Sequence, residues 1–271
     1  MSVTNVVCQR RHRCLHLLTD GASYSRDGVL LSIGNKAFTV PHWPGAMSSR
    51  GSAIGGALIE WSLSNRFQSF DELVDGVETE VPLIVRRFEL TDHVELILAG
   101  WSAARGAPEA YVIETSDSLP ANLTQAERDA GSANGSSGEM FSPDAFALTR
   151  LPDVVMGPIL SDDMVIAAHW TGVDVDGSPE AAISELRKII EMQRHDIRGD
   201  GMCWVGGFAQ LTTITPGGIS QRILHRWTKD VIGEPIKPEP IDWKAYNAAR
   251  AVESIPEGLS RLQRERKKAL S

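Results

Sequence analysis

The hydrophobic period of the sequence changes at Ser52, and this change limits the folds open to the chain. Residues 3–40 contain short apolar runs separated by a basic turn and by Gly28 and Gly34, which is typical of short β-strands. From Ser52 to about residue 87, apolar residues recur every three or four positions, which indicates helices. Strand-like runs return at 93–101 and 109–116. Strands on the outside and consecutive helices in the middle predict a layered α+β fold.

Local start signals define further elements. Ser69 is a suitable N-cap for a helix over 70–87 with acidic residues in its first turn, and Ser178 precedes a helix over 179–195 that has Pro at its first position. After that helix, two strand-like runs separated by the turn PGG predict a hairpin.

The composition along the chain suggests one domain and an appendage. We expect a domain over residues 1–230, with an exposed loop rich in Ser, Gly and Asn at about 118–142. Residues 231–271 hold several prolines and end in RLQRERKKAL, so we expect a C-terminal appendage with a terminal basic helix. Trp243 and Tyr246 belong to an apolar stripe in this appendage. Because an exposed stripe is a liability in a monomer, we predict that it packs on the domain or on a neighbouring subunit.

The net charge limits the partners that we expect, and the cysteine content limits the expected compartment. The chain of 271 residues has a formal net charge of −8, which argues against general affinity for nucleic acid or anionic membranes. Its three cysteines are too few for a disulfide framework, which favours a reducing compartment. We recognise no signal peptide and no membrane-spanning run, so the expected location is the cytoplasm.

Asp20 and Lys36 stand at unusual positions. Asp20 closes the apolar run 15–19, and Lys36 lies between Ile33 and Phe38, where a strand normally carries an apolar side chain. A buried Lys is costly unless it is paired, and a carboxylate is its natural partner. We therefore predict that Asp20 and Lys36 form an ion pair near the start of the first strand. The alternative is an edge strand with Lys36 in water.

Three alternating residues, His12, Cys14 and His16, would share one face of a regular strand, as zinc ligands can. They belong to a basic turn and have no fourth ligand nearby in the sequence, so we predict no metal site.

Several segments together resemble one known family. They are TDGASYSRDG, GNKAFTVP, SSRGSAIGGAL, LILAGWSAARGAPEAYVIETSD, SPEAAISELRKIIEMQRHD and VGGFAQLTTITPGGI. Their order and spacing resemble the proteasome β-subunit family and its bacterial relatives of the HslV and Anbu types, which are N-terminal-nucleophile (Ntn) hydrolases. The resemblance covers roughly residues 2–230. It implies a four-layer αββα sandwich, in which two stacked antiparallel sheets lie between helices 52–64 and 70–87 on one side and helix 179–195 on the other.

The chemistry of that family accounts for the Asp–Lys pair. The nucleophile is the hydroxyl of an N-terminal Thr or Ser, and the free α-amino group serves as its base. The resemblance implies that Lys36 lowers the pKa of this amine and that Asp20 holds Lys36. It also implies an oxyanion hole of backbone N–H groups in a turn formed by Ser49, Arg50 and Gly51. The implied substrates are peptide or amide bonds, no cofactor or metal is implied, and a homo-oligomer, including a ring, is expected.

Two residues can supply the nucleophile. Removal of Met1 would expose Ser2, whereas the family spacing counted back from Asp20 leads to Thr4. These two residues share one face of a strand. A long first hairpin turn favours Ser2, and Val3 is not the Gly with which propeptides of this family usually end, so Ser2 is slightly preferred.

One departure from the family opens a second interpretation. The family usually carries an Asp and a Ser ahead of a Gly-Gly pair, and here Met202 and Val205 stand at those places before Gly206 and Gly207. The alternative is therefore a catalytically inactive protein of the same fold that acts as a structural or binding subunit of an oligomer.

Overall fold

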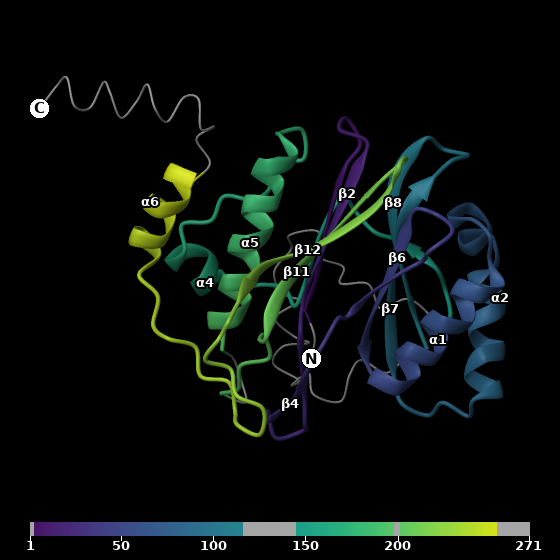
Figure 1. Cartoon of the computed structure of the whole chain (residues 1–271), viewed down its shortest axis with the longest axis horizontal. Coiled ribbons are helices and arrows are strands. Elements are labelled where there is room, and N and C mark those ends of the chain that lie inside the picture. Colours follow the sequence, from purple (N-terminus) through teal and green to yellow (C-terminus); the bar gives the residue numbers. More distant parts are fainter. Residues whose placement is uncertain (1–2, 116–144, 198–200, 254–271) are drawn as a thin grey trace, which may run out of the picture.

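Figure 1 shows the computed structural model, which describes residues 3–115, 145–197 and 201–253. The fold of these residues is α+β, as predicted, and its strands form three antiparallel sheets. The first five-stranded sheet has the order β10 (Val154–Gly157), β1 (Thr4–Gln9), β2 (Cys14–Asp20), β11 (Phe208–Thr215) and β12 (Gly218–Arg226). The second has the order β5 (Ala37–Thr39), β6 (Gly45–Gly51), β7 (Val94–Ser102), β8 (Ala107–Glu114) and β9 (Thr149–Arg150). The third pairs β3 (Ala22–Tyr24) with β4 (Leu30–Ile33).

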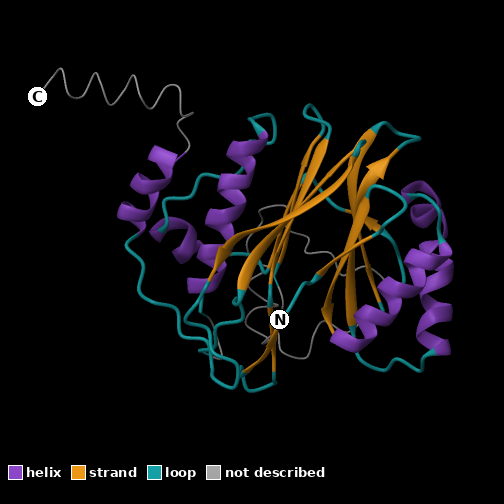
Figure 2. Cartoon of the chain, viewed as in Figure 1, coloured by secondary structure: helices purple, strands orange, loops and turns teal. Residues whose placement is uncertain are grey.

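The two five-stranded sheets face each other, and the helices lie on their outer sides (Figure 2). Side chains alternate along β1 between two apolar clusters. Val6 and Cys8 share a cluster with Ile97 and Val112 of the second sheet, whereas Val7 belongs to the cluster on the helical side. A core therefore fills the space between the sheets as well as the space under the helices.

Two of the helices begin at the predicted caps. The helices in the described residues are α1 (Ala53–Arg66), α2 (Phe70–Arg87), α4 (Asp162–Ala167), α5 (Pro179–His195) and α6 (Trp243–Glu253). Ser69 Oγ accepts a hydrogen bond from Glu72 N at 3.1 Å, and Ser178 Oγ accepts one from Ala181 N at 3.2 Å. α1 and α2 cover the second sheet, while α5 covers the first (Figure 1).

The segment after β12 packs on its own chain, which is one of the two predicted outcomes for its apolar stripe. Ile236 is buried in the cluster beneath α5, and the Trp243 ring lies edge-on to His195. Arg250 Nη2 donates to Glu185 Oε1 at 2.9 Å, which ties α6 to α5. The predicted loop 118–142 and the predicted terminal basic helix lie outside the described residues.

Truncation after Gly233 is expected to destabilise the protein. It removes Ile236, the backbone hydrogen bond from Leu30 N to Glu234 O, and all the contacts of α6. Loss of one buried aliphatic side chain alone costs about 2–5 kcal/mol. Urea unfolding would measure the difference, with a truncation after Glu253 as the control that leaves these contacts in place. An unchanged unfolding free energy for the shorter chain would contradict this interpretation.

No helix within the described ranges is both long enough and apolar enough to span a lipid bilayer.

Candidate active site

Asp20 is the last residue of β2, and its side chain is fully buried. Five donors surround its carboxylate. At Oδ1 they are Lys36 Nζ (2.6 Å) and Val3 N (3.1 Å), and at Oδ2 they are Tyr24 Oη (3.1 Å), Ala22 N (3.2 Å) and Gly206 N (3.2 Å). A carboxylate has about four lone-pair sites, so these contacts saturate it. The predicted ion pair is confirmed.

Lys36 lies just before β5 rather than within a strand. Its side chain is 12% exposed, so the alternative that placed it in water is wrong. Its Nζ lies 5.6 Å from the centre of the Tyr24 ring in addition to its contact with Asp20. Burial and the negative charge of Asp20 raise the pKa of the Tyr24 phenol, so this hydroxyl remains a donor. The ammonium group therefore lies between a carboxylate and an aromatic face.

The start of β1 lies beside this pair. Val3 is buried, and its backbone N–H donates to Asp20. Thr4 is also buried, and its Oγ1 lies 3.2 Å from Ser48 Oγ of β6, so Thr4 points between the sheets. Ser2 lies outside the described residues, and its peptide bond joins it to the Val3 nitrogen.

Ser49, Arg50 and Gly51 do not form the predicted turn. They are the end of β6 and pair with residues 94–96 of β7. Arg50 lies opposite Glu95, and its Nε donates to Glu95 Oε1 at 2.7 Å, which favours the extended pairing. Gly51, with φ of +98°, then turns the chain into α1. The oxyanion role of these three residues stays a prediction.

A buried carboxyl group lies behind this strand end. Glu60 of α1 is 7% exposed, and the side chain of Ser49 is hydrogen-bonded to it. Burial raises the pKa of Glu60 to about 7, and the bond to Ser49 opposes this shift only in part. Among the residues with a described placement, none hydrogen-bonds to Glu60 Oε1. A Cβ at Gly56 would lie 2.1 Å from Ser49 Oγ, so this glycine leaves room for the contact.

The Glu60→Gln variant is expected to be more stable than the original protein at alkaline pH. As the pH rises from 4.5 to about 7, the unfolded carboxyl group loses its proton while the folded one keeps it. The free energy of unfolding therefore falls through this window. Glutamine has no proton to lose, so the variant should match the original near pH 4 and exceed it by about 1–3 kcal/mol at pH 8. Urea unfolding at the two pH values tests this, and parallel pH profiles would refute it.

The described cysteines are poor nucleophiles. Burial raises the pKa of Cys8 to about 12 and that of Cys203 to about 11, so both remain thiols at neutral pH. Cys14 Sγ lies 3.6 Å from His16 Nε2, but burial raises the pKa of this thiol and lowers the pKa of His16 to about 4. The two groups therefore form a neutral pair rather than a thiolate–imidazolium pair.

Metal-binding geometry is not found in the described parts of the chain, where no group of three or more His, Cys, Asp or Glu residues could hold an ion. Of the three residues with zinc-like spacing, His12 is in the turn and its Nε2 lies 3.3 Å from Asp176 O. That turn separates it from Cys14 and His16 of β2.

Two surface cavities lie away from the Asp20–Lys36 pair. One of about 490 Å³ is lined by residues 39–44 and by the turn between β11 and β12. The other, of about 370 Å³, lies between α4 and the end of α5. Asp20 and Lys36 line neither cavity.

Sequence reasoning found only Lys36 among the five donors to Asp20 and missed the other four, which include a side-chain donor and a donor from a distant segment. The Tyr24 hydroxyl lies four residues along the chain, and the short strand β3 that carries it follows Asp20 after one residue. Gly206 comes from a segment 186 residues away, and the only signal for it is the Gly-Gly pair ahead of a strand.

Neither the family models nor the curated proteins searched with this sequence gave a match. The function is therefore argued from the geometry around Asp20.

Proposed function

We propose that the protein is an Ntn hydrolase that cleaves peptide or amide bonds with Ser2 as its nucleophile. The observation that carries this proposal is the Asp20 carboxylate, which binds both Lys36 Nζ and the backbone nitrogen of Val3. One buried anion thus joins a lysine to the residue that follows Ser2. This arrangement favours an N-terminal amine that acts as a catalytic base, since a nearby cation lowers the pKa of an amine.

The proposal includes the fold. The opposed sheets, with α1 and α2 outside one and α5 outside the other, support a four-layer αββα sandwich of the proteasome-subunit type (Figure 2). In such a sandwich, β1 and β2 bring the N-terminus and Asp20 to the same end of one sheet, and the register Thr4–Thr19 agrees with this.

Ser2 is preferred to Thr4 for a structural reason. A new N-terminus at Thr4 would require removal of Val3, which is 1% exposed and belongs to the apolar core beneath α5. The Val3 N–H bond to Asp20 would also be lost. Thr4 Oγ1 is already engaged with Ser48 Oγ between the sheets. Removal of Met1 alone leaves all three contacts in place.

The proposed reaction has two stages. The Ser2 hydroxyl oxygen adds to the substrate carbonyl carbon while its proton passes to the α-amino group of the same residue. The C–N bond then breaks, the α-amino group returns the proton to the leaving nitrogen, and an ester to Ser2 remains. Water then adds to the ester carbonyl carbon and gives a proton to the same amine. The C–O bond to Ser2 breaks, the amine returns this proton to the Ser2 oxygen, and the carboxylic acid is released. Lys36 keeps the amine neutral between these transfers, and Asp20 keeps Lys36 in position.

The test is covalent labelling of the purified protein with a β-lactone, an electrophile that acylates hydroxyl nucleophiles. The proposal predicts one adduct, at Ser2, when the labelled peptide is mapped by mass spectrometry. An adduct at Thr4 would instead identify Thr4 as the nucleophile. Labelling of neither residue, together with no hydrolysis of a peptide library, would contradict the hydrolase proposal.

The second candidate is a non-catalytic subunit of an oligomer with the same fold. It is favoured by Val205, a buried apolar residue at the place where the family carries Ser, and by Met202 at the place of its Asp. Specific labelling of Ser2 would count against this candidate.

A further inference from the structure

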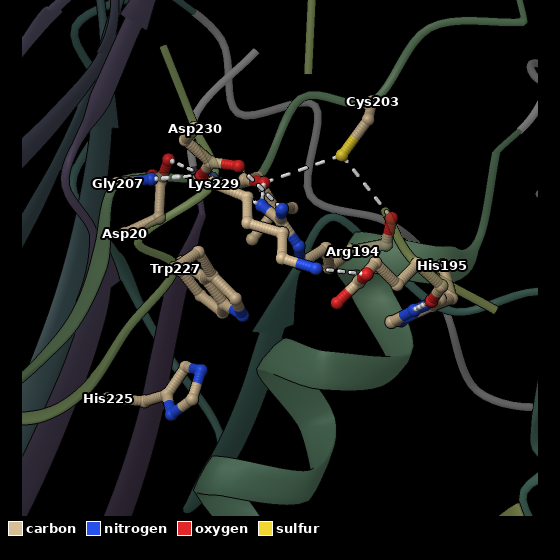
Figure 3. Close-up of polar contacts among 12 residues, drawn as sticks. Asp20, Arg194, His195, Cys203, Gly207, His225, Trp227, Lys229 and Asp230 are labelled. Carbon is tan, nitrogen blue, oxygen red and sulfur yellow. Dashed lines mark hydrogen bonds and ion pairs between the residues drawn. The ribbon is translucent and has the colours of Figure 1, made fainter. Parts of the chain in front are cut away.

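The backbone that binds Asp20 from the far end of the chain is itself held at three consecutive residues. Val205 O accepts from Arg194 Nη1 at 2.6 Å, Gly206 N donates to Asp20 Oδ2 at 3.2 Å, and Gly207 N donates to Asp230 Oδ2 at 2.7 Å. Asp20 and Asp230 thus accept hydrogen bonds from successive peptide groups, one on each side of Gly206 (Figure 3).

The ion pair of Asp230 and Arg194 is at least as buried as that of Asp20 and Lys36. The Asp230 and Arg194 side chains are 2% and 5% exposed. Arg194 Nη2 donates to Asp230 Oδ1 at 2.6 Å and Nη1 to Oδ2 at 3.0 Å, so the pair is bidentate. The Trp227 ring lies under the guanidinium group at 4.7 Å from its carbon, and the Trp227 indole is anchored by Glu191 Oε1 (Figure 3).

Two glycines allow the backbone at 206–207 to approach the Asp230 carboxylate closely. A Cβ at Gly206 would lie 2.7 Å from Asp230 Oδ2 and 2.2 Å from Ile236 Cδ1. Gly207 has φ of +73°, which side chains rarely allow. The Gly-Gly pair therefore lets the backbone pass between the two carboxylates of Asp20 and Asp230.

We propose that Asp230 and Arg194 are positioning residues for the Asp20–Lys36 pair. Together they hold the backbone from Val205 to Gly207 in place, so that the Gly206 N–H points at the Asp20 carboxylate. The segment after β12 is then part of the site, although it touches neither Lys36 nor the start of β1 in any contact described above. The catalytic meaning of this role rests on the proposed function, but the positioning itself does not.

Loss of the hydrogen bond from Gly206 to Asp20 is expected to affect Lys36, because Asp20 also binds Lys36. The Gly206 N–H is one of three donors to Oδ2, and losing it leaves the carboxylate freer to rotate. A less fixed Asp20 holds the Lys36 Nζ less firmly, so this nitrogen leaves the carboxylate more often and becomes open to an acylating reagent. Free amines react with acetic anhydride, whereas ammonium groups do not. The acetylation rate of Lys36 therefore reports the state of Asp20 without any need for catalysis.

The test compares the Asp230→Asn variant with the original full chain by the acetylation rate of Lys36 at several pH values, measured by peptide mass spectrometry. The amide of the variant turns an NH₂ group toward N–H donors of Arg194 or Gly207. The hydrogen bonds that hold the backbone from Val205 to Gly207 should therefore weaken. We expect acetylation of Lys36 to become about threefold faster or more at a fixed pH.

The matched control is Glu109→Gln, the same chemical change in another buried acid. Glu109 is 2% exposed and accepts from Arg105, Arg150 and Tyr111 in the second sheet. It has no contact with Asp20 or Gly206, so the rate at Lys36 should stay as in the original protein. Equal effects of the two variants, or none in Asp230→Asn, would overturn the proposal.

If Asp230→Asn does not fold, Arg194→Lys replaces it in the comparison. Lysine keeps the charge opposite Asp230 but loses the bidentate geometry, so an intermediate acceleration at Lys36 is expected. No acceleration would again overturn the proposal. Faster acetylation of Lys36 in the Asp230→Asn variant of a protein that no β-lactone labels would leave the positioning role standing and would remove only the hydrolase proposal.

Discussion

Replacing Lys36 with alanine is expected to lower the free energy of unfolding by about 3–5 kcal/mol and to abolish labelling of Ser2. The stability loss follows because the substitution removes the cation 2.6 Å from a fully buried carboxylate. The reactivity loss follows because the α-amino group would no longer be kept neutral beside a positive charge. Urea unfolding and β-lactone labelling measure the two effects on the same preparation.

Lys229→Ala provides the matched control for Lys36→Ala. Lys229 pairs with Glu239, but the two side chains are 72% and 70% exposed. Exposed pairs contribute about 0–1 kcal/mol, so this variant should be nearly as stable as the original. A double-mutant cycle with Asp20→Ala gives the coupling between Asp20 and Lys36. If Lys36→Ala costs no more than Lys229→Ala, the pair does not have the role assigned to it.

Replacing Ser2 with alanine is expected to reduce amide hydrolysis about a thousandfold or more, since the attacking oxygen is removed. The stability should change little, because the donors to Asp20 are unaltered by this change. Ser2→Thr keeps the hydroxyl group and should retain activity. Thr4→Ala removes only the contact with Ser48 Oγ and should have a smaller effect. Comparable losses in Ser2→Ala and Thr4→Ala would contradict the assignment of the nucleophile.

The parts of the fold that depend on local signals could be predicted from the sequence. The caps Ser69 and Ser178 and the helices after them follow from short-range hydrogen bonds and a sustained apolar period, and both occur as predicted. The Asp20–Lys36 pair could also be predicted, because a lysine in an apolar run demands a partner and Asp20 was the nearest candidate at a strand end.

The rest depended on contacts that leave no periodic trace. Asp230 lies in an irregular segment, and its contacts with Arg194 and Gly207 span 36 and 23 residues. The family resemblance implied a turn at Ser49–Gly51, yet pairing with β7 and the Arg50–Glu95 ion pair hold this segment extended. Glu60 reads as an ordinary polar residue of a helix, and only the packing of α1 on β6 reveals that it is buried.

If Ser2 is the nucleophile, it must carry a free amine, and the intact mass of the natively expressed protein shows whether it does. Mass spectrometry, combined with chemical sequencing from the N-terminus, identifies both the first residue and any blocking group. We expect a mass that lacks Met1 alone, with Ser2 as the first residue and its α-amine unmodified. A chain that retains Met1, or that carries a blocked amine on Ser2, would show that Ser2 is not an N-terminal nucleophile.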